Sequence, residues 1–177
     1  MAKTKVRKML GTADAPYSLS LMRLIETQSK TTLVTWCLRY SQENILPIYA
    51  VLHPEDGRPR ALLAAMQAWL DGKIKFPAVK EQILAIHAAA RQADGDPAAQ
   101  AALRALGQAA STIHMASHAL GLLFYGAAAR AYKELGIDAS KEAYESYAAA
   151  EAARLEATLR ELAVTDEKNP VKVKWYC

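Results

Sequence analysis

Apolar residues recur along most of the chain at the spacing of one helix face, so the sequence predicts an all-α fold. Leu33, Trp36, Cys37 and Tyr40 are an example, because they occupy positions i, i+3, i+4 and i+7. We expect about six or seven helices in a single-domain bundle. Their expected ranges are about 18–28, 30–42, 45–52, 59–72, 77–93, 97–136 and 141–164.

Small polar residues, prolines and glycines mark the expected helix ends. Ser29 and Ser140 suit N-caps, and Pro59 suits a first helical turn that ends at Gly72. Pro47 does not fit an undisturbed helix interior. It therefore either kinks one long helix or separates a second piece at 45–52.

The middle of the chain carries no Asp, Glu, Lys or Arg from Ala105 to Ala129. His114 and His118 lie near its centre and make insertion into a bilayer costly, so we predict a buried, uncharged central helical segment and no membrane span. The wider helical pattern of 97–136 would extend about 60 Å, which exceeds the width of such a domain. It must break, and the candidates are Gly107, the neighbourhood of Met115–His118, and Gly121.

Composition supports a folded domain with small side chains at its helix contacts. Apolar residues make up 52% and charged residues 23%, which excludes a disordered chain, and aromatic residues make up only 7%. We expect a basic flexible arm at 1–16, an all-helical domain at 17–165 and an extended C-terminal tail at 166–177.

The net charge of +4 comes from the N-terminal arm. Lys3, Lys5, Arg7 and Lys8 precede any acidic residue, and the rest of the chain holds 18 basic and 18 acidic residues. A nucleic-acid-binding protein is expected to carry a basic stripe on one element, and none is present. The charge therefore argues against nucleic acid as a partner.

The two cysteines form neither a disulfide framework nor a zinc-binding spacing. Cys37 lies in an apolar helical run and is expected to be buried, and Cys177 is the last residue. No apolar stretch follows the basic N-terminus, so we expect no signal peptide. These features predict a protein of the reducing cytoplasm.

Three histidines are the best candidates for chemistry. His114 and His118 are four residues apart and would share one face of an unbroken helix, with His87 on the preceding helix as a third ligand. One hypothesis is therefore a metal-binding or enzymatic bundle that uses these three histidines. The alternative is that they pack between small residues, because no Glu follows His114 and no Glu-x-x-His motif of a di-iron bundle is present. We assign no catalytic residue and no cofactor.

The densest charged cluster comprises Glu55, Asp56, Arg58 and Arg60, in the turn before a helix. Asp56 suits a cap, and the two arginines suit bidentate contacts to carboxylates or phosphates. The cluster is therefore either a capped helix start with internal ion pairs or a surface that contacts a partner.

Three stretches together resemble the Ala-rich, all-helical immunity proteins of bacterial polymorphic toxin systems. They are Pro54–Arg60 with the following helix to Trp69, His87–Arg91, and Gly107–Gly121 with its two histidines. The resemblance covers about residues 31–135. It implies a small cytoplasmic protein that binds and neutralises a cognate toxin, without a cofactor or a catalytic residue. The family often has Pro where this chain has Ala116, which would break the helix between the histidines.

The leading hypothesis is thus a non-enzymatic immunity protein with Glu55, Asp56, Arg58 and Arg60 as candidate contacts to a toxin. The rival hypothesis is a metal-binding or enzymatic bundle that uses His87, His114 and His118. Self-association through the Ala-rich surface is a third possibility, which would make the chain a homo-oligomer.

Overall fold

The structure is a computed structural model that describes residues 6–175. Its elements are α1 (Pro16–Ile25), α2 (Lys30–Tyr40), the π-helical turn η1 (Ser41–Ile45), α3 (Leu46–Ala50), α4 (Arg58–Leu70), α5 (Phe76–Gln92), α6 (Pro97–Ser111), the 3₁₀ turn η2 (Ala116–His118), α7 (Ala119–Leu135) and α8 (Lys141–Leu162). Because α2, η1 and α3 follow one another without interruption, the described part of the chain forms seven helical rods. The predicted all-α bundle is confirmed.

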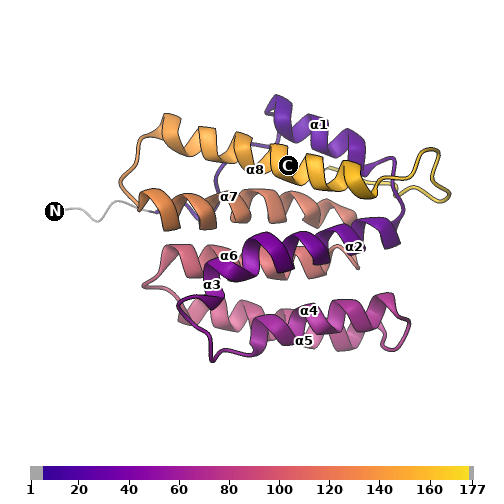
Figure 1. Ribbon diagram of the computed structural model, residues 1–177, viewed down its shortest axis with the longest axis horizontal. Coiled ribbons are helices and arrows are strands. Elements are labelled where there is room, and N and C mark those ends of the chain that lie inside the picture. Colours follow the sequence, from indigo (N-terminus) through magenta and orange to yellow (C-terminus); the bar gives the residue numbers. More distant parts are fainter. Residues whose placement is uncertain (1–5, 176–177) are drawn as a thin grey trace.

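The rods pack side by side as a layered bundle, with α1 and α8 at one face and α4 and α5 at the other (Figure 1). The middle is formed by α6, which packs against α7 most extensively and also contacts α2, α3, α4 and α5. Both central helices are rich in buried alanine and leucine, as the uncharged sequence at 105–129 predicts. Within residues 6–175, no helix is long and apolar enough to cross a membrane.

The expected local signals are present at several helix ends. The hydroxyls of Ser29 and Ser140 accept hydrogen bonds from backbone N–H groups in the first turns of α2 and α8. The carboxylate of Asp96 does the same for α6. Gly72 and Gly136 follow α4 and α7 with positive φ angles, a conformation that glycine adopts without strain. These three caps and two glycine stops fix the ends of the helices.

The long central segment breaks between Ser111 and Ala116. One of the three predicted places, the neighbourhood of Met115–His118, is therefore correct, and the two glycines are not breaks. Gly107 lies inside α6, where an added Cβ would come within 2.9 Å of Cε1 of His87. Gly121 lies inside α7, where an added Cβ would come within 2.6 Å of Cγ of Gln108. Both glycines allow neighbouring helices to approach closely.

Pro47 is accommodated within one continuous helix, which is the first of the two predicted alternatives. It follows the π-helical turn at Ser41–Ile45 directly. Proline has no N–H to donate and its ring crowds the carbonyl four residues earlier, here that of Glu43. A wider helical turn at this point removes that conflict.

A buried carboxylate joins three rods next to the π-helical turn. Glu151 on α8 has no solvent exposure. Its Oε1 accepts a hydrogen bond of 2.5 Å from the hydroxyl of Tyr40 on α2, and its Oε2 lies 2.8 Å from Nε of Arg130 on α7. Gly126 leaves room for the carboxylate, because a Cβ there would lie 3.2 Å from Oε1. The carboxylate of Glu151 thus has a cationic partner and a hydroxyl donor inside the core.

The described parts of both chain ends lie on the bundle. Leu10 is buried, and its N–H donates to the carbonyl of Phe124 on α7. At the other end, Val171 donates to the carbonyl of Gln28, next to a bridge between Ser29 and Pro170. Residues 170 and 171 thus pair with the α1–α2 loop, and the extended tail expected at 166–177 stays a prediction. The basic residues Lys3 and Lys5 lie outside the described residues.

The structure confirms the buried position predicted for Cys37. Its side chain has no exposure, and burial raises the pKa of the thiol to about 12. The thiolate is therefore inaccessible under ordinary conditions, and this cysteine is a packing residue. Cys177 lies outside the described residues.

We predict that Gly121→Ala destabilises the fold by about 1–3 kcal/mol, because the new methyl group must displace the side chain of Gln108. Combining it with Gln108→Ala should recover much of the loss, since the space is then free. Urea unfolding of the two single variants and the double variant measures the coupling. Additive losses would contradict the contact.

We predict that Glu151→Ala destabilises the fold by about 3–5 kcal/mol, because it leaves Arg130 and Tyr40 without their buried partner. Glu151→Gln is the matched control, since it keeps the volume and one acceptor oxygen, and it should cost less. Chemical denaturation followed by circular dichroism measures both. A loss of less than about 1 kcal/mol for Glu151→Ala would show that the network does not hold the rods together.

Candidate functional site

The predicted charged cluster lies in the loop that joins α3 to α4, and half of it forms an internal network. Asp56 accepts from the backbone N–H of Arg58 at 3.0 Å, from Nε of Arg58 at 2.9 Å and from its Nη2 at 2.8 Å. The hydroxyl of Tyr49 donates to Oδ2 of the same carboxylate at 2.7 Å, the oxygen that also accepts from Nη2 of Arg58. Arg58 also reaches Oε1 of Gln92 on α5 at 2.9 Å. Asp56 and Arg58 therefore fix this loop to α3 and α5.

The electrostatics of the loop favour the charged form of Asp56. The hydrogen bonds from Arg58 hold the pKa of this carboxyl well below its usual range, although burial opposes them. Burial and the bond to Asp56 raise the pKa of Tyr49 to about 12. Asp56 thus stays ionised and Tyr49 stays protonated at neutral pH, so the network is intact over the whole physiological range.

The other half of the cluster is directed outward. Glu55 and Arg60 are exposed, and neither side chain forms a hydrogen bond or ion pair with another described residue. Earlier in the same loop, Val51 and Leu52 expose 69% and 67% of their surface, the two largest values among the exposed large apolar residues. Adjacent apolar side chains flanked by free charges resemble the anchor and rim of a protein interface.

Val51 and Leu52 were not among the contact residues predicted from the sequence. They occupy the end of the expected helix at 45–52, where Val51 and Leu52 look like a continuation of its buried face. The helix instead ends at Ala50, and a turn at 51–52 directs both side chains to solvent. The proximity of Pro54 and Gly57 was the available signal for an early helix end.

The three histidines lie near one another but have separate partners. The rings of His114 and Phe76 stack with centroids 5.3 Å apart. His118 places Nδ1 2.8 Å from Oε1 of Gln108, and because an amide oxygen only accepts, this nitrogen donates. His87 packs over Gly107. The break between α6 and α7 removes the shared helix face on which the metal hypothesis was built.

Two of these imidazoles are shifted toward the neutral form. Burial lowers the pKa of His87, and the positive charges of Arg104 and Arg91 add to the effect. Burial is also the main reason that the pKa of His118 is lowered. Within residues 6–175, no group of three His, Cys, Asp or Glu side chains is placed to hold a metal ion.

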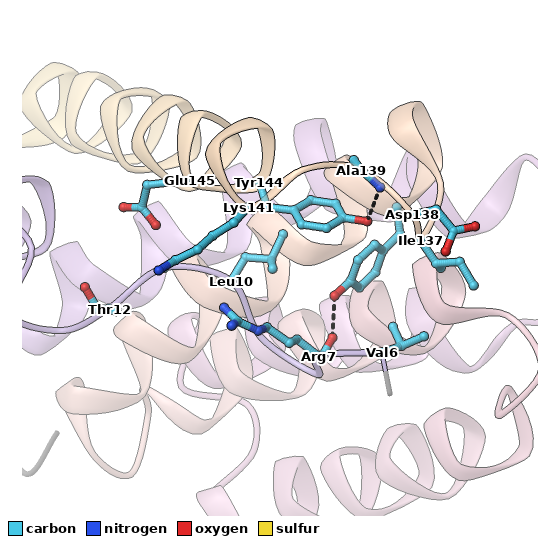
Figure 2. Close-up of a pocket in the computed structure, with 12 residues that line it drawn as sticks. Val6, Arg7, Leu10, Thr12, Ile137, Asp138, Ala139, Lys141, Tyr144 and Glu145 are labelled. Atoms are coloured by element: carbon cyan, nitrogen blue, oxygen red, sulfur yellow. Dashed lines mark hydrogen bonds between the residues drawn. The ribbon is translucent and has the colours of Figure 1, made fainter. Parts of the chain in front are cut away.

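A pocket of about 480 Å³ lies where the N-terminal segment meets the ends of α7 and α8 (Figure 2). Arg7 and Lys141 line it together with Asp138 and Glu145, so it presents both signs of charge. Tyr144 uses its hydroxyl within the fold, donating to the carbonyl of Gly136. Sequence reasoning did not find this pocket, because it is formed by segments more than a hundred residues apart.

We predict that the fold loses stability as the pH falls below about 6.5, the usual pKa of histidine in an unfolded chain. The unfolded chain then binds protons at His87 and His118 that the folded chain binds only at lower pH, so protonation favours unfolding. Urea midpoints measured at pH values from about 7.5 down to 5.5 test this. The double variant His87→Gln/His118→Gln should show a flatter profile, and an unchanged slope would contradict the prediction.

A family model described as Imm-5 like putative immunity protein matches residues 23–158. No curated protein and no solved structure matches the chain. The matched range is longer at both ends than the 31–135 expected from the residues, and it includes the α3–α4 loop, all three histidines and Glu151.

Proposed function

Because the chain belongs to the Imm-5 like putative immunity protein family, we propose that it binds a cognate protein toxin and neutralises it without catalysing a reaction. The observation that carries this proposal is the match over residues 23–158, most of the helical bundle. An inhibitor of this kind acts by covering the working surface of its target. It needs shape and charge complementarity rather than a reactive group.

We propose the α3–α4 loop as the surface that contacts the toxin. Val51 and Leu52 provide adjacent apolar anchors, and Glu55 and Arg60 provide free charges of both signs beside them. The Asp56 network supports this role indirectly, because it orders the loop before any partner arrives. A surface that is already ordered loses less conformational entropy on binding, which favours affinity.

The first test is co-expression with the polypeptide encoded next to this chain's gene. We expect the neighbouring product alone to inhibit growth, and the intact chain to restore growth and to co-purify with that product. Growth inhibition that the chain does not relieve would overturn the proposed function.

The second test addresses the surface. We predict that Leu52→Asp/Arg60→Glu weakens binding to the toxin by about 100-fold or more and abolishes protection, because the change removes an anchor and reverses a charge. Its unfolding midpoint should stay unchanged, since both side chains are exposed.

Leu84→Asp/Lys80→Glu is the matched control, with the same two kinds of change at exposed positions of α5. Titration calorimetry and the growth assay should show that it behaves like the unmodified chain. If the loop variant protects as well as the control, the loop is not the contact surface, while the proposed function itself stands on the first test.

A further inference from the structure

A second surface lies at the end of the bundle opposite the α3–α4 loop. It is a groove of about 540 Å³ between the turn that joins α6 to α7 and the C-terminal tail, with the start of α2 beside it. Figure 1 shows that the start of α2 and the α6–α7 turn lie at the end where the tail turns back. Glu167 fixes the tail there, because its carboxylate accepts from the N–H of Ser29 at 2.7 Å and from the hydroxyl of Thr32 at 2.6 Å.

The charge of the groove has one sign. Lys30, Lys172 and Lys174 line it, and all three are exposed. No Asp or Glu among the described residues contributes to its lining. This contrasts with the neutral average of the helical body and with the mixed charges of the pocket in Figure 2. A ligand that carries carboxylates would find complementary charge along the tail side of the groove.

The backbone of the tail has a free edge. Residues 171–175 form neither helix nor turn, and their side chains alternate between partly buried and exposed, as in an extended chain. Of the backbone N–H groups of residues 171–174, only that of Val171 donates to another described backbone group, the carbonyl of Gln28. Successive N–H groups of an extended chain point to opposite sides, so those of Lys172 and Lys174 point away from the α1–α2 loop. An unpaired extended edge can accept an added strand.

The groove also offers apolar contacts at strand spacing. Val171 and Val173 alternate with the two lysines along the tail, and Met115, which is 45% exposed, lies on the opposite wall. Side chains of an added strand that alternate between apolar and acidic would meet matching groups on this pattern.

We infer that this groove binds an acidic, extended segment of a partner protein, which pairs with the backbone of residues 171–174 while its carboxylates contact Lys30, Lys172 and Lys174. This site goes beyond the proposed toxin surface and does not depend on it. A single-stranded nucleic acid fits less well, because such ligands use aromatic stacking, and no Phe, Tyr or Trp among the described residues lines the groove.

The test uses a fluorescent synthetic peptide of about eight residues that alternates aspartate and valine, added to the full chain. We expect saturable binding that weakens as salt is raised. Lys172→Glu/Lys174→Glu should weaken it by about tenfold or more. The matched control is Lys8→Glu/Lys141→Glu, which makes the same change in net charge at other exposed positions and should bind normally. A peptide with lysine in place of aspartate should not bind.

Hydrogen exchange separates strand pairing from simple charge attraction. On binding, the amides of Lys172 and Lys174 should become protected. The inference fails if the peptide binds without this protection, if the lysine variant binds as well as the control, or if an oligothymidylate of similar length binds more tightly than the peptide and loses affinity in the same variant.

Discussion

The bundle depends on the hydrogen bonds that the fully buried carboxylate of Glu151 accepts from other helices. Glu151 lies at the meeting point of α2, α7 and α8, where the hydroxyl of Tyr40 and the guanidinium of Arg130 reach its carboxylate from two other rods. The geometry that allows this includes the bare backbone of Gly126 and the wide turn at Ser41–Ile45. A charged group in such a place fixes which helices are neighbours more strictly than apolar contacts do.

The two proposed binding surfaces are built on the ends of this frame. The α3–α4 loop follows the rod that contains the π-helical turn, and it is ordered by side chains from α3 and α5. The basic groove lies where α6 and α7 join, against a tail held by the start of α2. In both places, loops carry the exposed groups while helix ends position them, which is the usual division between scaffold and recognition surface.

Much of the fold could be predicted because local signals decide helix ends. Ser29, Asp96, Ser140 and Gly72 each act within a few residues, so their effect is visible in the sequence. The uncharged stretch likewise indicated a buried centre, since a run of 25 such residues fits no solvent-exposed helix.

The sites were harder to predict, because they depend on contacts between distant segments. The role of Glu151 requires partners 111 and 21 residues away, and its neighbours in sequence make it look like part of a charged outer face. The groove joins Lys30 to Lys172 and Lys174, which no spacing rule connects. In the charged turn, the residue types were informative, but only the geometry separates Asp56 and Arg58, which bind each other, from Glu55 and Arg60, whose side chains have no partner among residues 6–175.

The place of Glu151 in the chain has a consequence for biosynthesis. A translation product that ends before Glu151 contains Tyr40 and Arg130 but not the carboxylate that both contact. Such a product lacks the group that joins α2 and α7 through α8. The three-rod contact can therefore form only after α8 has been made.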